Sequence, residues 1–163
     1  MYVETKEPEM KRSPELTPLS HDHHQALFVA QGLKRARDAA SERERFLSFW
    51  HSHGQRHFEI EEQIVLPGWV EADAEADPRM AARLASEHLT IRAGARRLER
   101  SPVAAEELHE LGLLLERHVR FEERELFPLI ESRLDAETIA RIGAEIAVAE
   151  ERPRAESDRA TDP

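Results

Sequence analysis

An eleven-residue pattern that occurs twice constrains the fold of this chain more than any other feature. HFEIEEQIVLP covers residues 57–67, and HVRFEERELFP covers residues 118–128. In both copies a histidine is followed four residues later by a Glu-Glu pair and ten residues later by a proline. Residues four apart on a helix project from the same face, one turn apart. The repeat therefore predicts two helices that each direct a histidine and a glutamate to one side.

Both copies fall on the apolar face of their predicted helix. His57 and Glu61 share a face with Trp50, and His118 and Glu122 lie in line with a row of leucines. An unpaired ionised carboxylate in an apolar core costs several kcal/mol. A buried His-Glu hydrogen bond explains a single copy equally well. Two copies favour a cation shared between the helices.

Helical periodicity and end signals predict four long helices and a shorter fifth one. Their expected ranges are about 17–40, 41–67, 77–100, 101–128 and 135–149. Asp77 and Asp135 are N-cap signals, and Ser41 followed by Glu44 is a capping-box pattern. A proline is expected to stop the second and the fourth helix. Because most connections are short, we expect an all-α, antiparallel up-down-up-down four-helix bundle with an additional short C-terminal helix.

The two ends of the chain differ from the middle in composition. Residues 1–15 and 152–163 are polar or charged and contain prolines, so we expect both ends to be disordered. The bundle domain is expected to cover residues 16–151. This length is sufficient for one apolar core without disulfides.

Composition excludes several classes of function. Thirty-three acidic and 23 basic residues give a formal charge of -10, which disfavours nucleic acid and anionic membranes as partners. The chain has no cysteine, so a metal site must consist of histidine and carboxylate ligands, and Fe–S clusters are excluded. No run of about 18 apolar residues and no apolar signal segment are present. We therefore expect a cytoplasmic, soluble protein, monomeric by default.

Histidines also lie on the other two long helices. His88 falls on the inward face of the third helix, and His21, His23 and His24 cluster near the start of the first. A site of four histidines and two carboxylates suits two iron or manganese ions better than a single zinc. A carboxylate can bridge two metals about 3.5 to 4 Å apart. The repeat then corresponds to two half-sites related by approximate symmetry.

These segments together resemble the hemerythrin-like, or HHE cation-binding, domain. The resemblance covers roughly residues 17–133 and is carried by HHQALF, HFEIEEQIVLP, EHLTI and HVRFEERELFP. It implies an antiparallel four-helix bundle around a non-haem di-iron centre. Matched position by position, it implies the nitrogen ligands His24, His57, His88 and His118 and the bridging carboxylates Glu61 and Glu122.

Two of these positions have a neighbouring competitor. His24 is followed at the third and fourth positions by an apolar pair, as the family ligand typically is, whereas His23 follows an acidic residue and lies in line with apolar residues. For the second carboxylate, the five-residue spacing of oxygen-carrying hemerythrins would select Glu123. A gapless match to the first copy selects Glu122. We expect His24 and Glu122.

Arg92 occupies the position at which oxygen-carrying hemerythrins have a second histidine on this helix. Two octahedral ions have about twelve coordination positions, of which four histidines, two bridging carboxylates and a bridging oxygen fill about ten. Glu59 or Glu62 could fill an open position. A more open centre favours redox chemistry, reaction with peroxide or NO, or iron sensing over simple O2 carriage.

The expected function follows from this site. We expect a di-iron protein that handles O2, peroxide or NO, or that senses oxygen or iron through its centre. The alternative is a non-catalytic interaction or regulatory bundle in which the metal is only structural or a sensing ligand. Turnover of peroxide by iron-loaded protein would separate an enzyme from such a module.

Overall fold

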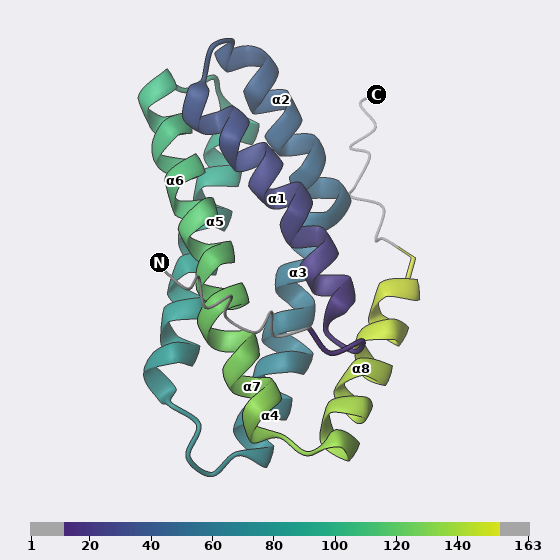
Figure 1. Cartoon of the computed structure of the whole chain (residues 1–163). Coiled ribbons are helices and arrows are strands. Elements are labelled where there is room, and N and C mark those ends of the chain that lie inside the picture. The colour runs from purple at the N-terminus through teal and green to yellow at the C-terminus, as the bar shows by residue number, and fades with distance from the viewer. Residues whose placement is uncertain (1–11, 154–163) are drawn as a thin grey trace, which may run out of the picture.

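A computed structural model describes residues 12–153 and confirms the predicted all-α bundle (Figure 1). The helical elements are α1 (Thr17–Arg35), α2 (Ala39–Phe49), η1 (Trp50–Gly54), α3 (Gln55–Ile60), η2 (Glu61–Val65), α4 (Leu66–Ala72), α5 (Pro78–Arg100), α6 (Ala105–Phe121), η3 (Glu122–Leu126), α7 (Phe127–Arg133) and α8 (Ala136–Glu151). Each η element is a single π-helical turn. Within the described range no strand occurs, and no helix there is long and apolar enough to cross a membrane.

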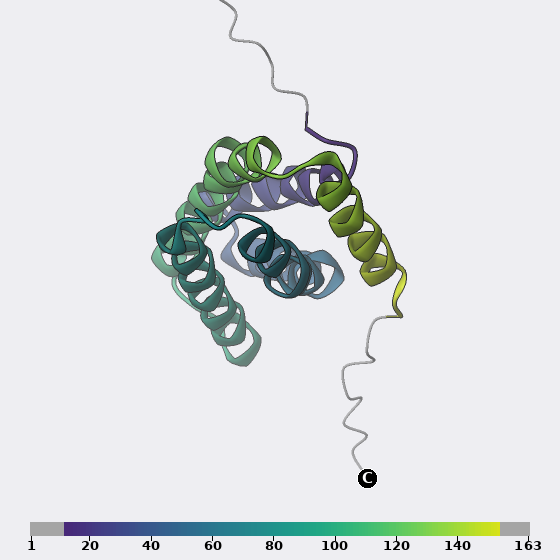
Figure 2. The same ribbon diagram turned by 90° about the horizontal axis from the view of Figure 1, so that it is seen from below.

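Continuous helices join several of these elements into four long rods. The backbone stays helical from α2 through α4 and again from α6 through α7, because the junction residues keep α-helical φ and ψ. We call these two continuous helices the α2–α4 helix and the α6–α7 helix. Together with α1 and α5 they are the four long helices of the bundle. With α1 and α5 they alternate in direction, up, down, up and down, while α8 runs alongside the lower half of the bundle (Figures 1 and 2).

The two prolines of the repeat do not end their helices, contrary to the sequence prediction. Pro67 and Pro128 each stand at the start of the α-helical segment that follows a π-turn. In the first copy the N–H of Leu66 donates to the carbonyl of Glu61, five residues back, and the second copy repeats this bond. A π-turn is wider than an α-turn and tolerates the proline ring and its missing N–H. The helices therefore continue through α4 and α7.

The N-caps were predicted in part. Asp77 and Asp135 cap α5 and α8 as expected, and each carboxylate accepts a backbone N–H of the first turn. The start of α2 differs, because Asp38 is its N-cap and accepts the N–H of Ser41, which therefore lies inside the first turn. α1 ends earlier than predicted, at a left-handed Ala36 with φ 40°. α6 begins after the predicted Ser-Pro pair rather than at it.

The buried apolar residues form two clusters. The α2-side cluster consists of Ala26, Val29, Ala30, Leu33, Phe46, Trp50, Phe58, Ile91, Ala95, Leu98, Leu108, Leu111, Leu115 and Val119. The α8-side cluster consists of Leu16, Leu19, Ile60, Val65, Trp69, Leu84, Phe121, Leu126, Phe127, Ile130, Leu134, Ile142 and Ile146. Along α5 the buried His88 lies between Leu84 of one cluster and Ile91 of the other. A polar layer thus separates the two halves of the core.

A glycine allows α1 and α6 to approach closely. A Cβ atom on Gly112 would lie 2.8 Å from the backbone oxygen of Ala30 and 2.9 Å from the Cβ of Leu33. Real Cβ atoms do not approach backbone this closely, so any side chain here would push the helices apart. Gly112 therefore sets the spacing of two helices that both contribute to the polar layer.

The C-terminal helix α8 is anchored at both ends of its contact with the α2–α4 helix. A Cβ on Gly68 would lie 2.9 Å from Ile142, which shows how closely α8 packs. At the other end, Arg56 donates to the backbone oxygens of Glu150 (2.7 Å) and Arg152 (2.6 Å). These bonds satisfy carbonyls that a helix end leaves without a partner.

Part of the N-terminal segment that we expected to be disordered lies against α7. Arg12 donates to Glu131 (2.7 Å), and the backbone N–H of Ser13 donates to the same carboxylate (2.7 Å). The ion pair and the backbone bond, together with the buried Leu16, hold residues 12–16 in place. Residues 1–11 and 154–163, which make up most of the ends predicted to be disordered, lie outside the described range.

Candidate metal centre

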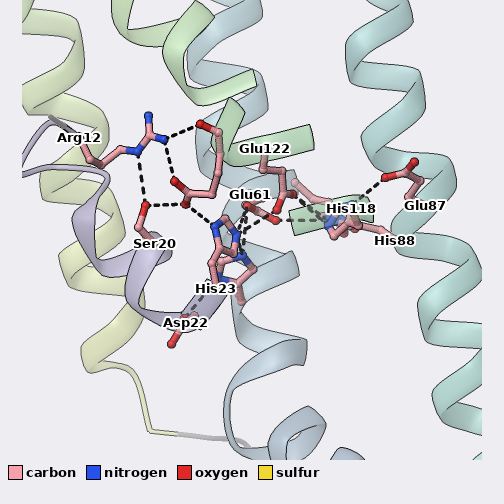
Figure 3. A network of polar contacts seen from close by, with 12 residues as sticks. Arg12, Ser20, Asp22, His23, Glu61, Glu87, His88, His118 and Glu122 are labelled. Atoms are coloured by element: carbon pink, nitrogen blue, oxygen red, sulfur yellow. Dashed lines mark hydrogen bonds and ion pairs between the residues drawn. The ribbon is translucent and has the colours of Figure 1, made fainter. Parts of the chain in front are cut away.

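Six buried side chains from all four long helices meet in the polar layer (Figure 3). They are His23 of α1, His57 and Glu61 of the α2–α4 helix, His88 of α5, and His118 and Glu122 of the α6–α7 helix. None of the six is more than 5% exposed. They form two groups of four ligands that share Glu61 and Glu122, and the ligand atoms within each group lie within 4.8 Å of one another.

The first half-site consists of His23, His57 and one oxygen of each shared glutamate. The Nε2 atoms of His23 and His57 lie 3.0 Å apart. Glu122 Oε2 lies 2.9 Å from His23 Nε2, and Glu61 Oε1 lies 3.1 Å from His57 Nε2. Two nitrogens and two carboxylate oxygens thus face one point.

The second half-site repeats this arrangement with His88 and His118. Their Nε2 atoms lie 3.1 Å apart. Here Glu122 presents Oε1, 3.0 Å from His118 Nε2, and Glu61 presents Oε2, 3.2 Å from His88 Nε2. Each glutamate therefore directs one oxygen to each half-site, which is the geometry of a carboxylate that bridges two cations.

The shared carboxylates fit a metal better than a protein hydrogen bond. Within the described part of the chain, all four oxygens of Glu61 and Glu122 are buried and make no hydrogen bond of good geometry, although each lies 2.9 to 3.2 Å from a histidine Nε2. Buried polar atoms without a partner are rare in folded proteins, and an ionised carboxylate is the most costly case. Cations at the two half-sites would give each oxygen a partner. The donor set of imidazole nitrogen and carboxylate oxygen suits iron and manganese.

Each of the four histidines is oriented by a second carboxylate. The Nδ1 atoms lie near Glu123 for His23 (2.5 Å), Asp22 for His57 (3.2 Å), Glu62 for His88 (2.7 Å) and Glu87 for His118 (3.0 Å). An Nδ1–H that donates to a carboxylate leaves the Nε2 lone pair of a neutral imidazole directed at the centre. This arrangement is typical of histidines that bind metals.

The pKa values show that the layer requires positive charge. Burial lowers the pKa of His118, but the carboxylates of Glu122 and Glu87 outweigh burial and raise it to about 10. Burial raises the pKa of Glu122, yet the surrounding histidines hold it well below its usual range. Burial likewise raises the pKa of Glu123, while hydrogen bonds from His23, Ser20 and Arg12 lower it to about 2. The carboxylates stay ionised, and either protons or metal ions must balance them.

The structure brings together five of the six predicted ligands and places the sixth outside the cluster. His57, Glu61, His88, His118 and Glu122 all belong to the cluster, as the sequence analysis placed them. His24, the sixth, is exposed and lines a surface hollow beside Phe28 on the outer side of α1. Successive helix residues are rotated by about 100°, so only one of two adjacent histidines can face the core. His23 does so, in line with the buried Leu19 and Ala30.

The choice between the two neighbouring glutamates agrees with the gapless match of the two copies. Glu122 is fully buried in the cluster, whereas Glu123 points to the Nδ1 side of His23 and to Ser20. Glu62, considered for an open coordination position, instead orients His88, and Glu59 is exposed.

Sequence reasoning missed the four orienting carboxylates as a set. Each of them adjoins a residue of the cluster in the sequence, in the pairs Asp22-His23, Glu61-Glu62, Glu87-His88 and Glu122-Glu123. This repeated adjacency was the available signal.

Arg92 does not enter the cluster. Its guanidinium donates to Glu62 (2.6 Å), the carboxylate that orients His88. In this chain the residue at this position therefore supports the orientation of His88, a member of the buried cluster.

Comparison with known proteins agrees with the site. The model of the hemerythrin HHE cation binding domain matches residues 16–130, which include all six residues of the cluster. Neither the curated proteins nor the solved structures contain a match to this chain. The family match covers well over half of the sequence, and the chain therefore belongs to the hemerythrin HHE cation-binding domain family.

Proposed function

We propose that the buried cluster binds two non-haem iron ions, one at each half-site, with Glu61 and Glu122 as the bridging ligands. The observation that carries this proposal is the orientation of the two glutamates. Each directs one oxygen to each histidine pair, and none of these oxygens accepts a hydrogen bond of good geometry within residues 12–153. Manganese prefers the same donors, so the donor set alone leaves it as the other candidate metal.

The site is suited to a small ligand. A cavity of about 10 Å³ adjoins the cluster, close to the space that one water-sized molecule needs. His23, His57 and His118 line one side. The apolar lining includes Ala26, Trp50, Phe58, Ile91, Leu115 and Val119. A space of this size suits a small ligand such as O2, NO or peroxide better than a larger organic molecule.

Open coordination positions support reactivity with such ligands. The cluster offers four imidazole nitrogens and four carboxylate oxygens to two ions that together accept about twelve donors. Arg92 is engaged by Glu62 and adds no donor. A bound iron pair would supply electron transfer to or from the ligand. We therefore propose that the protein handles O2, peroxide or NO, or senses oxygen or iron.

Iron reconstitution tests the proposal. Metal-free protein is loaded anaerobically with Fe(II), exposed to air, desalted and measured for bound iron and near-ultraviolet absorption. We expect two irons per chain and new absorption from iron(III) in this donor set, with His24→Ala as an unaffected control. Fewer than two irons per chain would contradict the di-iron proposal.

A peroxide assay then separates chemistry from binding. Steady-state peroxide consumption by the two-iron protein is compared with an equal concentration of free Fe(II). Faster consumption by the protein supports an enzymatic role. A rate no higher than that of free iron would leave binding or sensing as the function.

A further inference from the structure

Arg12 connects the segment before α1 to the α6–α7 helix. Its guanidinium donates to the Glu123 carboxylate (2.8 Å), to the Glu123 backbone oxygen (3.0 Å) and to Glu131 (2.7 Å). The Arg12 side chain is only 15% exposed. Both Arg12 and Glu131 lie outside the residues that match the family model, 16–130.

Two sets of contacts lead from Arg12 to His23. In the first, Arg12 holds one oxygen of Glu123, while the other oxygen accepts from Ser20 (2.6 Å) and lies 2.5 Å from His23 Nδ1. In the second, Arg12 lies over the ring of Phe127 (5.2 Å), which stacks with His23 (5.5 Å between ring centroids). Both sets fix the orientation of the His23 ring.

The other orienting carboxylates are held differently. Glu62 binds Arg92 (2.6 Å) and Glu87 binds Arg83 (3.2 Å), and both arginines lie on α5 within the bundle. In the described part of the chain Asp22 makes no ion pair other than that with His57. Glu123, which orients His23, is thus the orienting carboxylate whose arginine comes from outside the four long helices. Its geometry depends on how residues 12–16 are placed.

We propose that Arg12 is a positioning residue for the first half-site, which fixes Glu123 and thereby directs His23 Nε2 at the metal. This inference rests on the proposed two-metal function. Glu123 is 29% exposed, and within residues 12–153 only Arg12 bonds its second oxygen, so without the arginine this oxygen would be left to water and the carboxylate would be held by Ser20 and His23 alone. Loss of a partner that orients a metal-binding histidine typically weakens metal binding 10- to 100-fold. Arg12 acts one bond further out, so we expect about 10-fold.

Cobalt titration of metal-free protein tests this inference. Co(II) binding is followed by calorimetry and by visible absorption for the wild type, Arg12→Ala, Glu123→Gln and the double variant. We expect the wild type to bind two equivalents and Arg12→Ala to weaken one of them about 10-fold while the other is unchanged. If Arg12 acts through Glu123, Arg12→Ala will cause no further loss in the Glu123→Gln background.

A matched control separates positioning from a merely structural role. Arg45 is exposed, pairs with Glu42 and lies over Phe28, so Arg45→Ala should leave both cobalt affinities unchanged. Thermal unfolding of every metal-free variant is measured in parallel. An Arg12→Ala protein with a lower Tm but two unchanged affinities would overturn the inference, as would equal weakening of both equivalents. Failure of the wild type to bind two equivalents would instead contradict the proposed function.

Discussion

At the scale of single residues, the carboxylates around the histidines form a closed ring. Each acidic residue adjoins a member of the cluster on its own helix and orients a histidine on the next one: Asp22 orients His57, Glu62 orients His88, Glu87 orients His118 and Glu123 orients His23. Every bond of the ring crosses between two of the four long helices. The direction of each Nε2 lone pair is therefore set by helix packing, and the packing is stabilised by the same bonds.

The adjacent histidines of α1 offer a matched pair of variants. We expect His23→Ala to lose one of the two metal ions, because His23 Nε2 lies 2.9 Å from Glu122 Oε2 in the first half-site. His24→Ala should retain both, since His24 is exposed. Metal content per chain after reconstitution and desalting measures the difference. Loss of metal from the His24 variant alone would show that α1 directs His24, and not His23, at the metal.

The shared glutamates have a different expected effect from their neighbours. Glu61→Ala and Glu122→Ala should each prevent stable binding of the second ion, because each removes one oxygen from both half-sites. Glu59→Ala is the control, since Glu59 is exposed on the same helix. If both glutamate variants kept two ions, the bridging assignment would be wrong. If Glu123→Ala lost iron while Glu122→Ala did not, the five-residue spacing would be the correct one.

Sequence reasoning identified five of the six clustered residues because helical spacing fixes which residues share a face. The sixth residue of the cluster is His23 and not the predicted His24, because the local family pattern was given more weight than the alignment of His23 with Leu19 and Ala30. The orienting carboxylates could not be assigned to their histidines. Such an assignment requires knowledge of which helices are neighbours, and the sequence of one helix does not contain it.

At the scale of elements, the π-turns explain why the predicted helix ends were wrong. Glu61 and Glu122 are the first residues of η2 and η3, so each shared carboxylate lies where the helix widens ahead of a proline. A proline after an apolar pair usually indicates a helix end, because an α-helix cannot accommodate it. A π-turn removes that conflict, and such turns are frequent at functional sites. Local sequence signals do not distinguish the two outcomes.

Two glycines on facing helices should respond in opposite directions to alanine. Gly112→Ala should destabilise the protein by about 1 to 3 kcal/mol, because its Cβ would meet the backbone of α1 at 2.8 Å. A Cβ on Gly94 would approach only the side-chain end of Leu111, at 3.0 Å, which can move. Gly94→Ala should therefore be neutral or stabilising by up to about 1 kcal/mol through helix propensity. Urea unfolding measures both, and effects of the same sign would contradict the packing argument.

At the scale of the whole molecule, a charged layer separates two apolar clusters that would otherwise form one core. The four-helix topology was predictable, because apolar periodicity and two of the N-caps are local and the connections are short. What lies between the two clusters is the buried His/Glu cluster, to which every long helix contributes at least one side chain. The stability of the bundle must therefore depend on what balances the charge of Glu61 and Glu122.

Protons provide this balance in metal-free protein, which predicts a specific pH dependence. The ordinary pKa of histidine is 6.5, and that of His118 is raised to about 10 in the fold. The contribution of this raised pKa to the free energy of unfolding is fully present below pH 6.5. It is lost as the pH rises through 10. The loss from one such histidine is at most about 1.4 kcal/mol per pH unit.

The comparison between chelator-treated and metal-loaded protein tests this dependence. We expect the free energy of urea unfolding of chelator-treated protein to fall steadily between about pH 6.5 and 9, since folding then requires His118 to take up a proton that the unfolded chain no longer holds. Metal-loaded protein should lose much less over the same interval, because its histidines are already neutral and the metal supplies the charge. Parallel declines in the two samples would mean that other groups control the pH dependence. A steeper decline without metal would identify the buried layer as its source.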